Sequence, residues 1–187
     1  MPIGVLALQG DVREHKKLLS EFGEATVEVR TLLDLEVADA LIIPGGESTT
    51  ISKLLVNFGL MSAIRDFVAK KPVLGTCAGL ILLSDDVVGR LSDQELIGGL
   101  PIKVERNAYG GQTHSFESDV DFADSKDHVA FIRAPRIIEP GDTQVIASLE
   151  GEPVAVRYGS IFGASFHPEL TGAKELHKQF LEAVKAK

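Results

Sequence analysis

The only cysteine of the chain lies where a catalytic nucleophile would be expected. Cys77 is the central residue of positions 75–79 (GTCAG), between an apolar run typical of a strand and an apolar run typical of a helix. This G-x-nucleophile-x-G pattern indicates a nucleophile elbow, in which small flanking residues permit a sharp strand-to-helix turn. The helix N-terminus would favour a thiolate through its dipole and free N–H groups. The alternative is that Cys77 is a small buried apolar residue.

A histidine and a glutamate near the C-terminus could complete a catalytic triad. His167 and Glu169 belong to residues 166–169 (FHPE), just before the last helical stretch. Because Pro168 disfavours helical geometry at the residue before it, we predict an extended segment in which residues two apart point the same way. His167 would act as the base toward Cys77, and Glu169 would orient the imidazole. The alternative is that Pro168 and Glu169 simply begin a helix.

A glycine-rich turn provides a third candidate feature at residues 44–48 (PGGES), after a predicted strand. Ligands of open α/β sheets bind outside the carboxyl ends of the strands. Backbone N–H groups of such a turn could stabilise an oxyanion or hold a carboxylate. The alternative is an ordinary turn, with Ser48 or Thr49 capping the next helix.

The pattern of apolar residues predicts the elements that position these motifs. The first half alternates strand-like and helix-like segments, which predicts an α/β fold with a mostly parallel open sheet and helices on both faces. The strands are expected at residues 3–8, 26–29, 40–43 and 72–76, with helices over 12–22, 51–58 and 60–68 and after Cys77. Short strands expected at 100–106, 129–132, 145–147, 154–157 and 160–163 add antiparallel pairs, and a last helix follows Thr171. We find no linker, so residues 1–187 are predicted to form a single domain.

Composition excludes several classes of protein. A net charge of -8 argues against nucleic acid or an anionic membrane as a partner. One cysteine among 187 residues excludes an internal disulfide, and the absence of a leader or an apolar stretch of about 20 residues predicts a cytoplasmic protein. Dinucleotide and P-loop motifs are absent. The histidines show no metal-ligand spacing with the cysteine, so we expect neither metal nor cofactor, and we interpret His15 and His177 as partly buried structural residues.

Together the three motifs resemble the class I, triad-type glutamine amidotransferases. Further segments narrow the resemblance to the glutaminase subunits of pyridoxal 5′-phosphate synthase, and they span nearly the whole chain. These segments are residues 8–15 (LQGDVREH), 44–49 (PGGEST), 75–79 (GTCAG), 104–107 (VERN), 131–135 (FIRAP) and 166–169 (FHPE). The resemblance implies a flavodoxin-like fold and hydrolysis of L-glutamine to L-glutamate and ammonia.

The resemblance also implies a role for each matching residue. Cys77 would attack the glutamine amide to form a thioester, His167 would move the protons, and Glu169 would orient His167. Backbone N–H groups of Gly46 and Ala78 would hold the oxyanion. The substrate's α-amino and carboxylate groups would meet a larger set, namely Gly46, Glu47, Ser48, Arg106, Ile132 and Arg133.

The partner implied by the resemblance is a (β/α)8-barrel synthase subunit, which receives the ammonia through the protein interior. The assembly would hold twelve copies of each subunit, and the free glutaminase would be nearly idle until the partner rearranges the oxyanion loop. Gln9 would lie in the interface region. One departure concerns residues 109–112 (YGGQ), because the resemblance implies a basic residue near the position of Gly111.

Two other interpretations stay open at the level of sequence. The chain could be a class I glutaminase that serves a different synthase, or an α/β protein with a cysteine elbow and other chemistry. It could also be a non-catalytic binding subunit that keeps the fold, although the intact set of Cys77, His167 and Glu169 argues against this.

Overall fold

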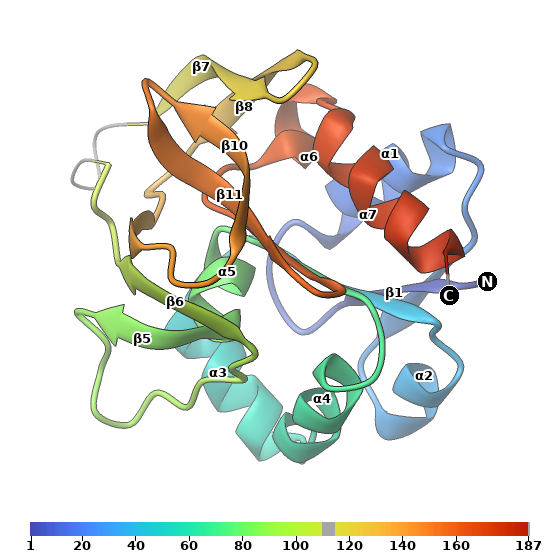
Figure 1. Cartoon of the computed structure of the whole chain (residues 1–187). Coiled ribbons are helices and arrows are strands. Elements are labelled where there is room, and N and C mark those ends of the chain that lie inside the picture. The colour runs from blue at the N-terminus through green and yellow to red at the C-terminus, as the bar shows by residue number, and fades with distance from the viewer. Residues whose placement is uncertain (110–114, 187) are drawn as a thin grey trace.

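The computed structural model describes residues 1–109 and 115–186, and its largest feature is a nine-stranded sheet (Figure 1). The strands of the chain are β1 Ile3–Leu6, β2 Thr26–Val29, β3 Ala40–Ile43, β4 Val73–Thr76, β5 Ser84–Val88, β6 Leu100–Glu105, β7 Phe116–Phe122, β8 Lys126–Phe131, β9 Arg136–Glu139, β10 Gln144–Leu149, β11 Glu152–Tyr158 and β12 Ile161–Ala164. The large sheet has the order β2-β1-β3-β4-β12-β11-β10-β7-β8, and a smaller sheet has the order β5-β6-β9.

The large sheet has a parallel part and an antiparallel part. Strands β2, β1, β3, β4 and β12 pair in parallel with one another. From β12 onward, the pairs β12–β11, β11–β10, β10–β7 and β7–β8 are antiparallel. Strands β1, β3, β4 and β12 are buried along their whole length. They are continuous apolar runs because both faces of a parallel sheet are covered.

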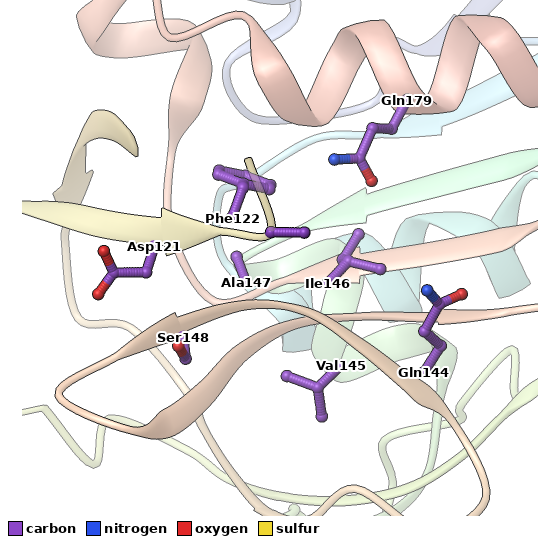
Figure 2. A pocket seen from close by; sticks show the side chains of 9 residues that line it. Asp121, Phe122, Gln144, Val145, Ile146, Ala147, Ser148 and Gln179 are labelled. Atoms are coloured by element: carbon purple, nitrogen blue, oxygen red, sulfur yellow. The ribbon is translucent and has the colours of Figure 1, made fainter. Parts of the chain in front are cut away.

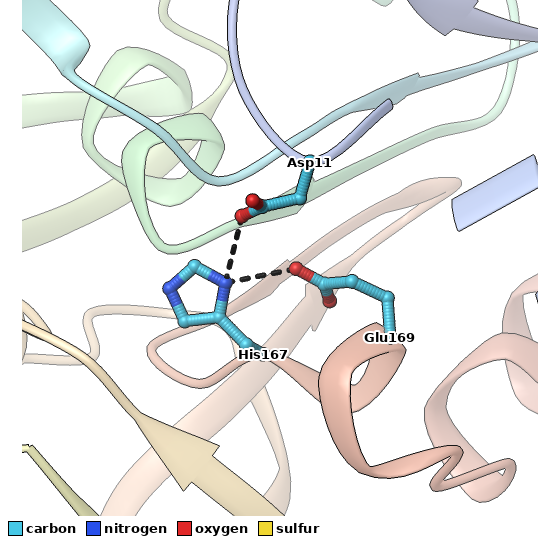
Figure 3. A group of neighbouring side chains, drawn as sticks. All are labelled: Asp11, His167 and Glu169. Atoms are coloured by element: carbon cyan, nitrogen blue, oxygen red, sulfur yellow. Dashed lines mark hydrogen bonds and ion pairs between the residues drawn. The ribbon is translucent and has the colours of Figure 1, made fainter. Parts of the chain in front are cut away.

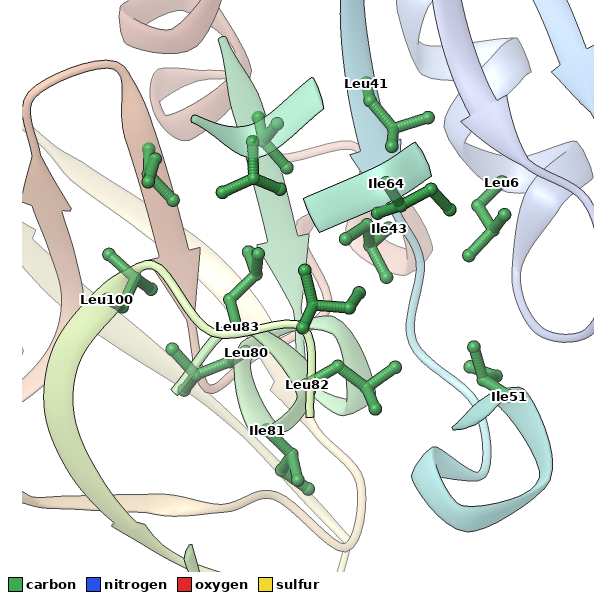
Figure 4. Close-up of a cluster of buried hydrophobic side chains, with 14 of the residues drawn as sticks. Leu6, Leu41, Ile43, Ile51, Ile64, Leu80, Ile81, Leu82, Leu83 and Leu100 are labelled. Carbon is green, nitrogen blue, oxygen red and sulfur yellow. The ribbon is translucent and has the colours of Figure 1, made fainter. Parts of the chain in front are cut away.

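Helices cover both faces of the parallel part and bury two apolar clusters. The helices are α1 Val12–Glu21, α2 Leu32–Glu36, α3 Ser48–Asn57, α4 Met61–Val68, α5 Ala78–Leu83, α6 Pro168–Thr171 and α7 Glu175–Lys185. One cluster lies under α2, α3, α4 and α5, and its members include Leu41, Ile51, Ile64 and Leu82 (Figure 4). The other lies under α1 and α7, and it includes Leu19 and Phe180. The two helical layers are visible on opposite sides of the sheet in Figure 1.

The predicted fold class is confirmed, with parallel strands in the first half and antiparallel strands later. The first strand ends at Leu6 rather than at residue 8, and the short helix α2 and the strands β5, β7 and β9 were not predicted. Strand β7 was missed because its sequence FESDVDF is acidic and only Val120 and Phe122 are buried. Such a strand is visible only as a weak alternation. None of the helices within the described residues is both long and apolar enough to cross a bilayer.

Candidate active site

The predicted catalytic residues meet at one edge of the sheet. Gln9 follows β1, Glu47 follows β3, Cys77 follows β4 and His167 follows β12. These four strands are parallel neighbours, so their carboxyl ends lie together. This is the edge where open α/β sheets bind ligands, at the point where the strand order reverses between β1 and β3.

The predicted sharp turn is present at Cys77. The residue has φ 48° and ψ −99° and lies directly before the first residue of α5. A left-handed φ is uncommon for residues other than glycine, and such strain clusters at functional sites. Gly79 lets the helix pack against β3, since a Cβ there would lie 2.1 Å from the backbone oxygen of Ile43. Cys77 Sγ is 3.7 Å from the carbonyl oxygen of Ile132.

His167 is held by its backbone and by two carboxylates. Its N–H donates to the carbonyl of Ala130 at 2.8 Å. Its Nδ1 lies 2.8 Å from Glu169 Oε1 and 3.2 Å from Asp11 Oδ2 (Figure 3). A Cβ at Gly45 would approach His167 Cε1 to 2.2 Å, so only glycine fits beside the ring. The geometry therefore leaves Nε2 as the nitrogen available to Cys77 and a substrate.

The prediction that residues 167–169 are extended was wrong beyond His167. His167 itself has φ −112° and ψ 86°, but Pro168 is the first residue of α6 and Glu169 lies in its first turn. Proline fits the first helical position because its missing N–H has no intrahelical partner there. Glu169 nevertheless reaches His167, so the predicted contact is present for a different geometric reason.

The charges around His167 favour its protonated form. Burial opposes the charge, but hydrogen bonds with Asp11, Cys77 and Glu169 outweigh it and raise the pKa of His167 to about 12. Burial also raises the pKa of Glu169, against the opposing effect of the hydrogen bond from His167. A protonated ring at this position could donate a proton to a group bound in front of Cys77.

Asp11 was not predicted as part of the site. Donor atoms of Asp11, His167 and Glu169 all lie within 4.8 Å of one another, which could suit a metal ion. However, both carboxylates face the same ring nitrogen, so both can accept from one Nδ1–H without a metal. The sequence signal for Asp11 was its place after the first strand, at the edge where Gln9 was already noted.

The glycine-rich turn continues into helix α3, and its cap differs from the prediction. Neither Ser48 nor Thr49 caps the helix; the Glu47 side chain does, accepting from the N–H groups of Thr49 and Thr50. Burial opposes its charge, but these bonds and those from the two threonine hydroxyls lower the pKa of Glu47 to about 2. Arg106 Nη2 lies 3.3 Å from Glu47 Oε1. Glu47 is therefore bound to protein groups, so its predicted contact with a substrate ammonium would have to be shared.

A pocket of about 290 Å³ opens in front of these residues. Its lining includes both Cys77 and His167 and all six predicted substrate-binding positions; the full set is Gln9, Gly10, Asp11, Gly46, Glu47, Ser48, Cys77, Ile81, Arg106, Asn107, Ile132, Arg133, His167 and Leu170. Ala78 and Glu169 lie behind this surface. Gln9 reaches the loop by accepting from the Glu47 N–H at 2.8 Å. The position of Gly111, where the sequence departs from the resemblance, lies outside the described residues.

Strained backbone is concentrated at this pocket. Among the described residues, four that are not glycine have positive φ, and three of them, Cys77, Asn107 and Arg133, line the pocket. Asn107 and Arg133 follow the ends of β6 and β8. Sequence reasoning gave no signal for this strain at Arg133, because arginine has no preference for left-handed backbone.

A second pocket of about 270 Å³ lies between β7, β10 and α7 (Figure 2). It is lined by Asp121, Phe122, Ala123, Gln144, Val145, Ile146, Ala147, Ser148 and Gln179. Asp121 is its only ionisable side chain and pairs with Lys126 at 2.7 Å. Its lining therefore holds no cysteine, no histidine and no ionisable side chain that lacks an ion-pair partner.

The chain matches known glutamine amidotransferases along nearly its whole length. The sequence profile of the SNO glutamine amidotransferase family matches residues 5–186. The chain is 49% identical to pyridoxal 5′-phosphate synthase subunit PdxT of Frankia alni, over 98% of this chain and 95% of the relative. It is 50% identical to the PdxT subunit of Brevibacillus brevis, over 99% and 98%. A crystal structure of a glutamine amidotransferase superposes with a TM-score of 0.92 at 45% identity, covering 98% of each chain.

Proposed function

The chain belongs to the SNO glutamine amidotransferase family, and from this we propose that Cys77, His167 and Glu169 release ammonia from glutamine for pyridoxal 5′-phosphate synthesis. The predicted function, a glutaminase subunit of pyridoxal 5′-phosphate synthase, is confirmed by this membership and by the PdxT relatives. The assignment of residues to steps is our proposal. The observation that carries it is the strained Cys77 at the pocket floor, beside an imidazole held by two carboxylates.

In the first step, the Cys77 thiolate attacks the side-chain amide carbon of glutamine. The oxyanion that forms is held by the backbone N–H groups of Gly46 and Ala78, the second at the N-terminus of α5. His167 gives its Nε2 proton to the departing nitrogen, so ammonia leaves and a glutamyl thioester remains. The raised pKa of His167 favours the protonated ring that this step needs.

In the second step, water attacks the thioester. Neutral His167 takes a proton from the water, glutamate leaves and the Cys77 thiolate is restored beside the imidazolium. Glu169 and Asp11 stabilise the positive ring in both steps through Nδ1. The triad logic requires only that the carboxylate orients and stabilises the ring, not that it becomes protonated.

The α-carboxylate and α-amino groups of glutamine bind the outer part of the pocket. Arg106 is the best-placed cation for the carboxylate, because its guanidinium lines the pocket and is already oriented by Glu47 and by Gln94 Oε1 at 3.4 Å. Glu47, Ser48 and the backbone around Gly46 and Ile132 complete this set, with Arg133 beside them. All of these positions line the same pocket.

The ammonia passes to a partner synthase subunit, as the word subunit in the PdxT names implies. We expect a (β/α)8-barrel partner in an assembly with twelve copies of each chain, and we expect partner contact near Gln9 to complete the oxyanion loop. In support, Gln9 Oε1 accepts from the Glu47 N–H, so a change at Gln9 reaches the turn that carries Gly46.

The test is glutamate release from glutamine, with and without the co-purified barrel subunit. Release that rises with the partner and disappears in Cys77→Ala supports the proposal. The variant must still support the partner reaction when ammonia is supplied directly. Release by Cys77→Ala at the wild-type rate would remove the assigned nucleophile, and coupling only to a synthase of another fold would overturn the partner assignment.

A further inference from the structure

Behind the triad lies a pair of buried histidines that the proposed mechanism does not use. His15 in α1 and His177 in α7 are both fully buried, and His15 Nδ1 lies 3.1 Å from His177 Nε2. The other nitrogen of His15, Nε2, is 3.1 Å from the Thr76 hydroxyl. Thr76 directly precedes Cys77, so the pair contacts the base of the nucleophile turn. The expectation of partly buried structural histidines therefore understated their burial.

The second oxygen of the triad glutamate faces this pair. Glu169 Oε1 accepts from His167, but Oε2 is buried and has no hydrogen-bond partner among the described residues. His15 Nε2 is 3.5 Å from Oε2, which is slightly longer than a normal hydrogen bond. Catalytic hydrogen bonds in ligand-free structures are often long and tighten when substrate binds. His15 Nε2 is thus within reach of the buried oxygen and can satisfy it.

The positions of the protons on the two rings decide which nitrogen donates and which accepts in each of these contacts. Burial lowers the pKa of His15 well below its usual value and lowers that of His177 to about 4, so each ring is neutral with one N–H. If His15 carries its proton on Nε2, it donates toward Thr76 and Glu169, and its Nδ1 accepts from His177 Nε2–H. The opposite arrangement places a lone pair of His15 against the Glu169 carboxylate and leaves the His177 Nδ1–H without an acceptor. Only the first arrangement gives the buried Oε2 of Glu169 a donor, since Oε1 already accepts from His167.

We propose that His15 is a positioning residue of the active site, which holds Glu169 through its Nε2–H, while His177 fixes the ring state of His15. The inference rests on the proposed function of Glu169 as the carboxylate that orients His167. The chain of contacts then runs from His177 through His15 and Glu169 to His167 and Cys77. At metal sites, the groups that orient ligating imidazoles and carboxylates matter in this way, and losing one typically lowers affinity or activity about 10- to 100-fold. We expect a loss of similar size here.

The first turn of α1 supplies both contacts to the carboxyl side of the triad. Asp11 precedes the helix and touches His167 Nδ1, and His15, four residues later, touches Glu169 Oε2. The His15 N–H donates to the Asp11 carbonyl at 3.2 Å, which closes this turn. Residues four apart lie on the same face of a helix. One helical turn therefore places the Asp11 carboxylate beside the His167 imidazole and the His15 imidazole beside the Glu169 carboxylate.

The first experiment reads the proton directly. Nitrogen-15 NMR of the wild-type chain labelled at histidine, bound to its partner subunit, distinguishes the protonated ring nitrogen from the bare one. We expect neutral His15 with its proton on Nε2 and neutral His177 with its proton on Nε2. A proton on Nδ1 of His15 would overturn the proposal, because His15 could not then donate to Glu169.

The second experiment compares two amides at position 15. His15→Gln places an amide nitrogen near the original Nε2, whereas His15→Asn places one near Nδ1. We expect His15→Asn to lower kcat for glutamate release about 10- to 100-fold with KM within about twofold, and His15→Gln to recover most of that loss. Thermal unfolding of both variants controls for a general loss of stability. Equal kcat for the two variants at equal Tm would overturn the proposal.

The two experiments separate this inference from the function on which it rests. If the wild-type complex releases no glutamate, the proposed function fails, and the NMR result still decides whether His15 points its proton at Glu169. If glutamate release is normal and His15→Asn is as active as wild type, the function stands and the positioning role is wrong.

Discussion

Two pockets of nearly equal volume differ in everything that matters for chemistry. The pocket at Cys77 measures about 290 Å³ and the one between β7, β10 and α7 about 270 Å³. The first lies at the carboxyl ends of parallel strands and is lined by a cysteine, a histidine and two arginines. The second lies among antiparallel strands, and its single carboxylate is already paired with Lys126.

The comparison shows that convergent strand ends make a site, and that volume does not. Parallel strands deliver the residues that follow each of them to one edge, so positions far apart in sequence, such as Gln9 and His167, meet there. Antiparallel strands run in opposite directions, so the residues that follow β10 and those that follow β11 lie at opposite ends of the paired strands. If this difference holds, substitutions at the first pocket should change glutamate release and substitutions at the second should not.

Replacing the base should nearly abolish activity at the first pocket. His167→Asn removes the side chain that we assign to carry protons between Cys77, the substrate and water. We expect kcat for glutamate release in the partner complex to fall by about 10⁴-fold or more, since triad members act as a unit. The double variant with Cys77→Ala should be no worse than either single variant. Near-normal turnover of His167→Asn would contradict its role as base.

The buried histidine His177, behind the first pocket, should make the free energy of unfolding depend on pH. Burial lowers the pKa of His177 to about 4, so between about pH 6.5 and 4 the unfolded chain takes up a proton that the folded chain does not. Stability is therefore fully present above about pH 6.5 and is lost as the pH falls, by about 3 kcal/mol from this group.

Chemical denaturation at several pH values checks this expectation. The free energy of unfolding of the wild type should fall more steeply over this range than that of His177→Gln, which has no titrating group at this position. Parallel curves for the two proteins would contradict the buried, neutral state of His177. The second pocket is lined by apolar residues such as Phe122, Ile146 and Ala147, and its lining includes no histidine.

Replacing Arg106 should mainly weaken the binding of glutamine. Arg106→Met removes the cation that we assign to the glutamine carboxylate, and a charged hydrogen bond is worth about 1.5–3 kcal/mol, or about 10- to 100-fold in KM. Arg106→Lys should lose less, because it keeps the charge but not the guanidinium fork. Steady-state kinetics over a range of glutamine concentrations separates KM from kcat. A loss confined to kcat would show that Arg106 does not bind the ground-state substrate.

Removing the Asp11 carboxylate should lower activity less than replacing His167 or Arg106. Asp11→Asn takes one negative charge from His167 Nδ1, so the pKa of the imidazole should fall while Glu169 still holds the ring. Because the protonated ring serves the leaving ammonia, the alkaline limb of kcat should move to lower pH. We expect little loss near pH 7 and a larger loss, up to about tenfold, at the alkaline end of the profile. An unchanged pH profile would contradict any effect of Asp11 on His167.

The smallest effect is expected at the second pocket. Gln144→Ala changes its lining but touches none of the residues assigned to catalysis. Glutamate release and its dependence on the partner should stay within about twofold of wild type, as for most surface substitutions. A large loss would mean that this pocket, despite its lack of reactive groups, is coupled to the site.

The parallel half of the fold was predictable from sequence, and the acidic strands were not. Continuous apolar runs mark β1, β3 and β4 because both faces of those strands are buried. Strand β7 buries two of its residues and exposes its acids, so its sequence resembles a loop. The cap of α3 was also missed, because short side chains are the usual caps and Glu47 reaches its helix only through a longer one.

The motifs that we propose to be catalytic were visible in the sequence, but the residues at the start of α1 that contact them were not. Cys77, His167 and Glu169 lie in recognisable local patterns, and the structure brings His167 and Glu169 into contact with each other. Asp11 and His15 act from the other end of the chain, through a helix whose packing no local pattern reveals. The positive φ of Arg133 was likewise not predictable, because arginine has no preference for left-handed backbone.

The left-handed backbone at Cys77 sets stability and turnover against each other at one position. A glycine there would adopt the same φ without strain, and strain of this kind costs about 1–3 kcal/mol. Selection for a sturdier fold alone would therefore replace the nucleophile. A copy of this chain released from the need to make ammonia should drift toward glycine at position 77 while keeping the sheet, the helices and the empty pocket intact.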